Sequence, residues 1–491
     1  MCEKGGSVIL KSINSFNEIR NLKENLNIEF KTCEKELNKD FWDTYSSFAN
    51  TDGGIILLGV KEGKDNKSNI IIGVENPDKI IKEIVTTANN PSKVSENLLK
   101  DSDILLITEK EKTVIVVNIA KLNFKKRPLY LKNNIFSAYK RISDSDQLCS
   151  KEEIKAMIRD SEGEPLDRKI ITGFTQEDLD NLTVDKYRLK LKEVNEECLY
   201  NSISDRKEFL SEIGVLVKNR ETGKEEITLG GLLMFGKTNS ITQFLPHFHL
   251  EYIDKSNEND ERWSDRVIFD TTWGANNIYN FFNVVMSKLE ANVKTPFKLK
   301  ADNLTRDESS PFKKALREAF VNTLIHADYE FPAGIIITRL KDKYIFTNPG
   351  TLRISREDIL SGKAHSDARN RKLMELFRFI KFSEQAGSGM KEILKAVNEL
   401  GLMMPDIEEK NGKITFILPD TKILSHDNLT EKEKIIMAYV LENGSIQKGK
   451  VREIFEINDY QARKILNTLI EKSYLIPIGE RRGVKYILKK I

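Results

Sequence analysis

The pattern of hydrophobic and polar positions along the chain predicts a mixture of strands and helices. Short apolar runs bounded by turn residues predict strands, which we place at 55–60, 70–74, 104–108, 113–119, 231–235, 247–253, 334–339 and 344–348. Apolar residues spaced three or four apart predict helices, which we place at 41–48, 312–327, 374–379 and 390–400. The predicted fold class is α+β with several domains.

Changes in pattern along the chain predict four domains. Residues 1–160 mix helices and strands, and residues 168–300 form an α+β connecting domain. A long helix followed by strands and further helices marks 301–420, and a module of short helices with a hairpin occupies 426–491. The polar stretch 159–167, which contains Gly and Pro, predicts a linker between the first two domains.

Composition excludes several classes of protein. Of the 491 residues, 31% are charged and 39% hydrophobic, which is typical of a globular chain. The longest apolar runs are far shorter than the roughly 20 residues of a membrane-spanning helix, and no secretory signal is visible at the start. The four cysteines lack C-x-x-C spacing, which argues against zinc or disulfides. We therefore expect a cytoplasmic protein with free thiols and no membrane partner.

Charge is unevenly distributed although the net charge is only +3. Residues 121–141 contain seven basic residues and no acid, interleaved with four aromatic residues. Residues 457–491 contain eight basic residues and three acids, a local charge of 8 − 3 = +5. Both stretches predict contact with nucleic-acid phosphates, with the aromatic rings available for stacking. The alternative is that the lysines are merely solvated and the rings belong to the core.

The N-terminal motifs resemble those of the Schlafen AlbA-like domain. The resemblance rests on Glu24-Asn-Leu-Asn-Ile-Glu29-Phe-Lys31, Ser47-Phe-Ala-Asn-Thr-Asp-Gly-Gly54, Leu58-Gly-Val60, Arg127-Pro-Leu-Tyr130 and Tyr139-Lys-Arg141-Ile-Ser143. It implies an α+β domain that binds DNA or RNA. The basic residues that would bind nucleic acid there are Lys31, Lys125, Lys126, Arg127, Lys140 and Arg141.

The same resemblance implies an alternative activity, because some Schlafen proteins are metal-dependent RNA nucleases. Their carboxylates correspond by motif position to Glu24, Glu29 and an acid after the Gly-Val pair, which here would be Glu62. Three carboxylates can hold Mg²⁺ or Mn²⁺ and activate water. The family acid usually follows Val directly, where this chain has Lys61, so the triad departs from the family pattern.

Glu318, Asn322 and His326 are spaced four apart and therefore share one face of the predicted helix at 312–327. This segment resembles the N box of the GHKL ATPases, in the variant found in RecG-related bacterial regulators. The resemblance continues through Thr347-Asn-Pro-Gly-Thr-Leu352 and Glu384-Gln-Ala-Gly-Ser-Gly-Met390. We expect no G-x-x-x-x-G-K-[ST] phosphate loop anywhere in the chain, so the RecG-related label does not imply a helicase motor of the P-loop type.

The GHKL resemblance implies an ATP site over about 300–420. Asn322 would hold Mg²⁺, Glu318 would act on the attacking water, and four further residues would contact the nucleotide, namely Asn348, Gly350, Gly387 and Gly389. Asn348 stands where the family usually has an aspartate, which favours binding over turnover. The alternative is a GHKL scaffold kept for dimerisation alone.

The C-terminal module has the predicted order of a winged helix-turn-helix. Thr430-x-x-Glu433 is a capping box that opens its first helix, and a hairpin follows the third. The third helix would present Arg463 and Lys464 to a DNA groove, with Arg481 and Arg482 on the wing. The alternative role is protein contact only.

Together these features predict an ATP-binding, nucleic-acid-binding transcriptional regulator. The enzyme alternative is a metal-dependent nuclease of RNA or DNA in antiphage defence, with the GHKL domain as its sensor. The resemblances also imply a homo-oligomer. A third reading is an interaction scaffold without either chemistry.

Overall fold

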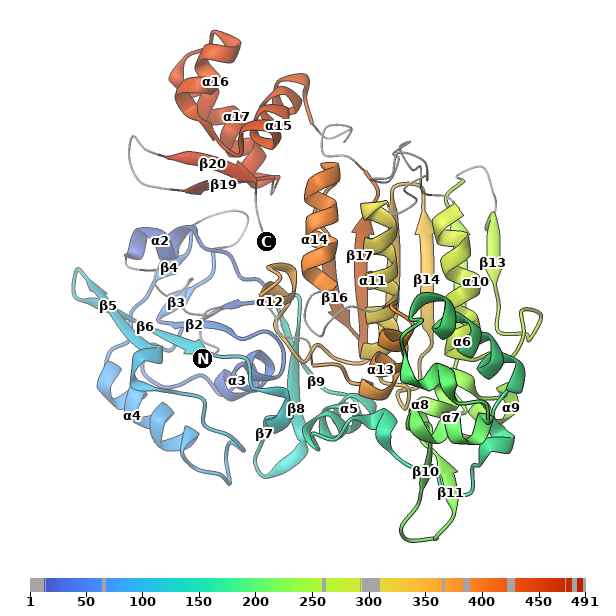
Figure 1. Cartoon of the computed structure of the whole chain (residues 1–491). Coiled ribbons are helices and arrows are strands. Elements are labelled where there is room, and N and C mark those ends of the chain that lie inside the picture. The colour runs from blue at the N-terminus through green and yellow to red at the C-terminus, as the bar shows by residue number, and fades with distance from the viewer. Residues whose placement is uncertain are drawn as a thin grey trace.

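The computed structural model describes residues 13, 15–63, 68–257, 262–291, 293, 310–363, 367–382, 389–421, 429–472, 474–478 and 484–488. Its elements form an N-terminal part, a central part built on a large sheet, and a C-terminal module that lies above the N-terminal part in Figure 1. The predicted α+β multidomain fold class is confirmed. Among the described helices, none is long and apolar enough to cross a membrane.

The N-terminal part is built around a four-stranded sheet of order β1-β2-β6-β5, in which β1 and β2 run parallel. Apolar side chains on both faces of β2 and β6 are buried, so two cores form, one under α3 and α4 and one under α2. Gly53 has a φ of +75° before β2, and a Cβ there would lie 2.8 Å from the Ile119 carbonyl oxygen, so this turn requires glycine. The elements are α2 (Phe16–Asn21), β1 (Ile28–Lys31), α3 (Phe41–Asn50), β2 (Gly54–Leu58), β3 (Val60–Lys61), β4 (Ile70–Ile71), α4 (Pro77–Ala88), β5 (Ile104–Glu109), β6 (Lys112–Ile119), η2 (Phe124–Lys126), β7 (Tyr130–Leu131), β8 (Asn134–Ile142), β9 (Ser145–Leu148) and α5 (Lys151–Ser161).

The stretch 159–167 is not the solvated linker that its polarity predicts. Helix α5 continues to Ser161, and both Asp160 and Asp167 are buried. Asp160 is paired with two arginines, and Asp167 accepts a hydrogen bond from the Leu373 backbone N–H at the start of α13 (Arg371–Phe379). The acids are buried because they have partners, which sequence polarity alone does not reveal.

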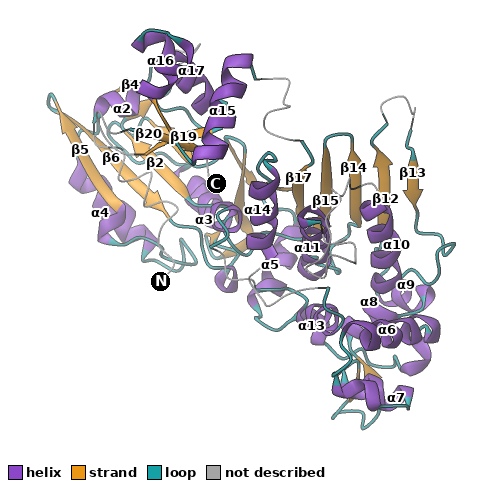
Figure 2. Ribbon diagram, turned by 45° about the horizontal axis from the view of Figure 1, so that its top comes forward, coloured by secondary structure: helices purple, strands orange, loops and turns teal. Residues whose placement is uncertain are grey.

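The central part is a six-stranded sheet of order β13-β12-β14-β15-β17-β16. Strands from both sides of the boundary predicted near residue 300 share this sheet, and one core extends over both. Helices α10, α11 and α14 lie on one face of the sheet (Figure 2). The elements up to that boundary are α6 (Asn181–Val194), α7 (Arg206–Glu212), β10 (Leu216–Lys218), β11 (Glu225–Ile227), α8 (Leu229–Phe235), α9 (Thr238–Phe244), β12 (Leu250–Lys255), β13 (Asp265–Val267) and α10 (Ile278–Ala291). Those beyond it are α11 (Pro311–His326), β14 (Ile335–Leu340), β15 (Lys343–Pro349), α12 (Arg356–Leu360), α13 (Arg371–Phe379), α14 (Gly389–Leu400), β16 (Asp406–Lys410) and β17 (Lys413–Pro419).

The strand predicted at 231–235 is wrong, because this segment belongs to helix α8. Every residue of α8 is buried. A helix that is apolar on all sides has no polar face to show the helical period, so its sequence cannot be told from a buried strand.

The C-terminal module consists of three helices and a three-stranded sheet of order β18-β20-β19. Thr430 and Glu433 form the predicted capping box at the start of α15. The elements are α15 (Glu431–Asn443), β18 (Ile446–Gln447), α16 (Lys448–Phe455), α17 (Asp459–Glu471), β19 (Leu475–Ile478) and β20 (Lys485–Leu488). Their order agrees with the predicted elements, and the role of the module as a winged helix stays a prediction.

Candidate functional site

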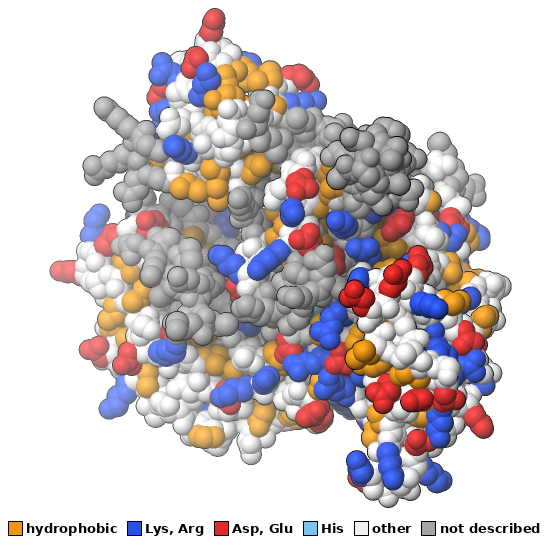
Figure 3. Space-filling view, in the orientation of Figure 1, with side chains coloured by type: hydrophobic (Ala, Val, Ile, Leu, Met, Phe, Trp, Pro, Cys, Tyr) orange, Lys and Arg blue, Asp and Glu red, His pale blue; other side chains and the backbone are white. Residues whose placement is uncertain are grey.

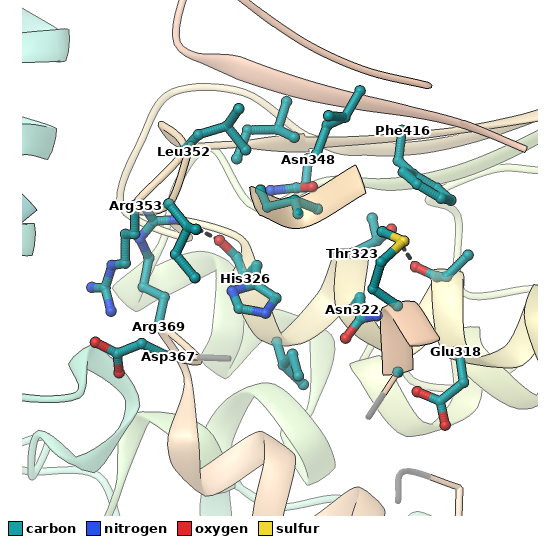
Figure 4. Close-up of a pocket in the computed structure, with 18 of the residues that line it drawn as sticks. Glu318, Asn322, Thr323, His326, Asn348, Leu352, Arg353, Asp367, Arg369 and Phe416 are labelled. Carbon is teal, nitrogen blue, oxygen red and sulfur yellow. Dashed lines mark hydrogen bonds between the residues drawn. The ribbon is translucent and has the colours of Figure 1, made fainter. Parts of the chain in front are cut away.

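Helix α11 forms one wall of a pocket in the central part. Glu318, Asn322 and His326 all line this pocket, and they lie along one face of the helix (Figure 4). The opposite face packs into the core, since Leu316 and Phe320 are fully buried. The spacing of four residues therefore gives α11 one face for the core and one for the pocket, as the sequence predicts.

At one end of the pocket, Gly389 lies directly against Glu318 and Asn322. A Cβ at position 389 would be 2.8 Å from a Glu318 carboxylate oxygen and 3.1 Å from the Asn322 amide nitrogen. Among the described residues, no hydrogen bond engages the Asn322 carboxamide, so it is available to a ligand. Gly387 lies outside the described residues. This end of the pocket has side-chain oxygens that can bind a metal ion, and a glycine that lets a phosphate come close to the backbone.

The middle of the pocket is apolar with one buried amide. Asn348, at the end of β15, is buried and donates a hydrogen bond from its side chain to the Pro349 carbonyl. Phe416 and Leu352 line the same region (Figure 4). Gly350 has a φ of +126°, and a Cβ there would lie 2.6 Å from the Arg369 guanidinium. Gly350 is therefore required for packing against Arg369.

The other end of the pocket is basic, which sequence reasoning missed. Arg353, Arg369 and His326 line it together with Asp367. Burial, together with the positive charges of Arg369 and Arg353, lowers the pKa of His326 to about 4. His326 is therefore neutral at pH 7, and the positive charges at this end come from the two arginines. Arg353 directly follows the motif that ends at Leu352, and Arg369 precedes the motif that begins at Glu384. Their partner Asp160 is about 200 residues away, so no local pattern reveals the pairing.

The three carboxylates predicted to bind a metal ion do not form a metal site. Glu29 is paired with Lys31 at 3.2 Å and with Arg141 at 2.7 Å. Partial burial, with the negative charges of Glu29 and Glu62 nearby, raises the pKa of Glu24 to about 7, so the three acids do lie near one another. Within the described ranges, no three His, Cys, Asp or Glu side chains are placed to hold a metal ion.

Three of the six basic residues predicted to bind phosphates in the N-terminal part are buried, namely Lys31, Arg127 and Arg141. Lys31 and Arg141 hold Glu29, and Arg127 donates to the Leu352 carbonyl of the central part at 2.9 Å. Their predicted contact with phosphate does not agree with this burial. Their charge is used inside the protein, which the sequence cannot distinguish from charge at the surface.

The other three basic residues remain nearer the surface. Lys125 and Lys126 are exposed on η2, and Lys126 has a weak surface pair with Glu96. Lys140 is paired with the buried Glu153. On the face drawn in Figure 3, lysines and arginines are interspersed with acids. Binding of a nucleic acid on this face would therefore depend on small groups of neighbouring cations.

In the C-terminal module, Arg463 and Lys464 are exposed on α17 as predicted, while Arg481 and Arg482 lie outside the described residues. Tyr460, on the same helix, is 76% exposed and has no motif that marks it in the sequence. An aromatic side chain that protrudes beside two cations at the start of a helix suits contact with a nucleic acid.

One segment of the sequence, Gly231–Thr238, does fit the P-loop pattern G-x-x-x-x-G-K-[ST]. The structure places its first five residues in the buried helix α8, and a Cβ at Gly236 would lie 2.3 Å from the Leu232 carbonyl oxygen. Both glycines serve packing. The expectation that the sequence holds no such pattern is therefore wrong, and in this structure the segment is part of the packed core.

Comparison with known families identifies two of the domains. Residues 24–150 match the family described as "Schlafen, AlbA_2", and residues 333–418 match "Putative ATP-dependent DNA helicase recG C-terminal", a HATPase_c_4 family. Residues 24–150 are thus similar to the Schlafen AlbA_2 domain, and residues 333–418 are similar to the RecG-related HATPase_c_4 domain. Both resemblances noted in the sequence are thereby confirmed. The second match begins after α11, so Glu318 and Asn322 lie outside it. Residues 155–251 match a domain of unknown function, DUF8451.

Comparison with solved structures gives two distant neighbours that bear on this chain. A crystal structure of the DIP2311 protein from Corynebacterium diphtheriae is 16% identical, covers 94% of this chain and 92% of its own, and has a TM-score of 0.43. A solution structure of the N-terminal domain of a RecG-related protein from Nitrosomonas europaea is 24% identical, covers 30% of this chain and 95% of its own, and has a TM-score of 0.20. No curated protein matches this chain.

Proposed function

We propose that this chain is a nucleic-acid-binding regulator that binds ATP with Mg²⁺ in the pocket beside α11. The observation that carries the proposal is the convergence of Glu318, Asn322 and Gly389 at one end of a pocket whose other end is basic. The match of 333–418 to an ATP-dependent family supports it. As in the sequence prediction, we assign nucleic-acid contact to the N-terminal part and to the C-terminal module.

The residues of the pocket fit a nucleotide. Bound ATP with Mg²⁺ would supply a hydrolysable phosphoanhydride. The Asn322 carboxamide would hold the metal ion, and Gly389 gives the phosphates access to backbone N–H groups at the start of α14. Asn348 is placed to accept from an amino group on the ligand, without the charge of an aspartate. Glu318 is placed to orient water.

Calorimetry with Mg-ATP tests this proposal. Wild type is expected to bind, Asn322→Ala to lose binding, and Glu318→Ala to retain binding while any ATP turnover is lost, because a water-orienting carboxylate acts in the transition state. Asn283→Ala, on the neighbouring α10 and outside the pocket, is the matched control. Absence of wild-type binding at millimolar nucleotide would leave only the scaffold alternative.

For the N-terminal part, the ion pairs favour nucleic-acid binding over cleavage. Glu29 is neutralised by two buried cations, and a metal ion would have to displace them. Incubation with tRNA, single-stranded RNA and duplex DNA, in Mn²⁺ or in EDTA, separates the two functions. We expect retarded but intact nucleic acid in both conditions, and metal-dependent cleavage that is lost in Glu24→Gln would instead establish the nuclease.

A further inference from the structure

The segment 351–354 separates the pocket from the N-terminal part. All four of its residues line the pocket. On the other side, the segment takes part in four contacts with the N-terminal part, which are Thr351 to Asp160 at 3.4 Å, the Leu352 carbonyl to Arg127 at 2.9 Å, Arg353 to Asp160 at 2.7 Å and the Ile354 carbonyl to Lys121 at 3.4 Å. Any ligand that moves this segment therefore acts on the N-terminal part as well.

Arg353 is the side chain in this segment that can change partners. Arg369 holds Asp160 through two hydrogen bonds, at 2.8 and 2.7 Å, one to each carboxylate oxygen. Asp160 therefore stays paired if Arg353 leaves it. Arg369 is 1% exposed and also donates to two backbone carbonyls, so it is fixed in place. A nucleotide with its phosphates at the Asn322 end would contact Arg353 through its base, at the opposite end of the pocket.

Arg353 also holds the basic loop of the N-terminal part. Its guanidinium lies over the Phe124 ring, 4.8 Å from the ring centroid. Phe124 is 8% exposed and begins η2, whose next two residues, Lys125 and Lys126, are exposed to solvent. A cation over an aromatic face fixes the position of the ring, so displacement of Arg353 would remove one restraint on η2.

We propose that Arg353 couples the pocket to the nucleic-acid-binding surface of η2. A bound nucleotide displaces Arg353 from Asp160 and Phe124, and the release of Phe124 changes the affinity of Lys125 and Lys126 for a nucleic-acid backbone. The inference rests on the proposed function, since the ligand is a nucleotide. Coupling between two sites is reciprocal and typically changes affinity by about 5- to 150-fold.

The test compares affinities for RNA with and without nucleotide. Fluorescence anisotropy measures binding of a labelled 20-nucleotide single-stranded RNA by the full chain, in the presence or absence of Mg-AMP-PNP. We expect at least about a fivefold change in wild type. Phe124→Leu, which keeps an apolar side chain but removes the ring, should reduce the change to within about twofold while calorimetry shows the same nucleotide affinity. Arg356→Ala is the control, because this arginine pairs with Asp406 outside the pocket.

A second measurement needs no ligand. Trypsin cleaves after Lys125 and Lys126, and Arg353→Ala should speed this cleavage several-fold over wild type while Arg356→Ala should not, because local opening governs cleavage. The proposal is overturned if nucleotide changes RNA affinity equally in Phe124→Leu and in wild type. It is also overturned if wild type binds nucleotide but binds no RNA, or binds RNA with an affinity that nucleotide does not change. If wild type binds no nucleotide, the proposed function fails, and unchanged trypsin cleavage in Arg353→Ala would overturn the Arg353 restraint separately.

Discussion

Asp160→Asn is expected to destabilise the central part of the protein substantially. Asp160 is 2% exposed and accepts hydrogen bonds from Arg369 and Arg353, with the shortest at 2.7 Å to each. The substitution keeps the shape of the side chain but removes its charge. The buried Arg369 and the partly buried Arg353 then lose their shared carboxylate, and the amide nitrogen of asparagine would face donors that cannot accept from it.

The size of the effect follows from the burial of all three groups. Removing one partner of a buried ion pair typically costs about 3–5 kcal/mol, because the remaining charge is left uncompensated. We expect the lower part of this range, about 3 kcal/mol, because the asparagine oxygen still accepts from one arginine. For a cooperative unit of about 150–250 residues, that loss corresponds to a fall in Tm of roughly 6–12 °C.

Differential scanning calorimetry and urea unfolding measure this loss. Asp185→Asn is the matched control, since Asp185 pairs with Arg206 at the surface and should change stability by less than about 1 kcal/mol. The arginines hold the pKa of Asp160 well below its ordinary value. Its stabilisation is therefore full above about pH 4 and declines as the pH falls further, so the gap between wild type and Asp160→Asn should narrow in acid. A loss below 1 kcal/mol at pH 7 would refute this reasoning.

Three further predictions test the other sites. Gly389→Ala should weaken Mg-ATP binding at least tenfold in calorimetry, because its Cβ would lie 2.8 Å from the carboxylate on α11, whereas Gly449→Ala, where a Cβ meets nothing within 4 Å, should not. Burial raises the pKa of Glu24 to about 7, so the folded protein is destabilised where this carboxylate is ionised. Glu24→Gln should therefore raise the free energy of unfolding by about 1–2 kcal/mol at pH 8, after allowance for its partial exposure, and by nearly nothing at pH 5. Equal gains at both pH values would contradict this. Arg463→Ala with Lys464→Ala should weaken binding of a 20-base-pair DNA and flatten its salt dependence, and an unchanged salt slope would remove the module from DNA contact.

Local patterns in the sequence predict the elements and one face of the pocket, but not the long-range pairs. The spacing of Glu318, Asn322 and His326 fixes their shared face, because helix geometry depends only on neighbouring residues. Asp160 and Arg369, in contrast, are 209 residues apart and meet only through the fold. The polarity of Asp160 and its neighbours predicts exposure, so we expect a solvated linker at 159–167, whereas the structure has a buried ion pair there.

The basic residues of the N-terminal motifs also show that the sequence does not predict which charges are buried. Arg127 belongs to a motif that carries the Schlafen resemblance, and its charge predicts a phosphate contact. The structure buries it between the Asn50 and Leu352 carbonyls. A count of charges along the chain cannot separate a cation that meets solvent from one that meets a partner domain, whereas burial separates them at once.

The buried contact between the N-terminal part and the pocket has balanced charges, which bears on how the ligand lies. Asp52 and Glu409 face Lys121 and Arg127, while Asp160 faces two arginines of the pocket wall. Asp367 lines the same end of the pocket and acts on Arg353. The cluster therefore holds four cations, Lys121, Arg127, Arg353 and Arg369, against four acids, Asp52, Asp160, Asp367 and Glu409, a balance of 4 − 4 = 0. Because His326 is neutral at pH 7, it does not add to this charge. A wall without excess charge gives a phosphate no net attraction, so its electrostatics suit the neutral base of a nucleotide whose phosphates lie at the Asn322 end.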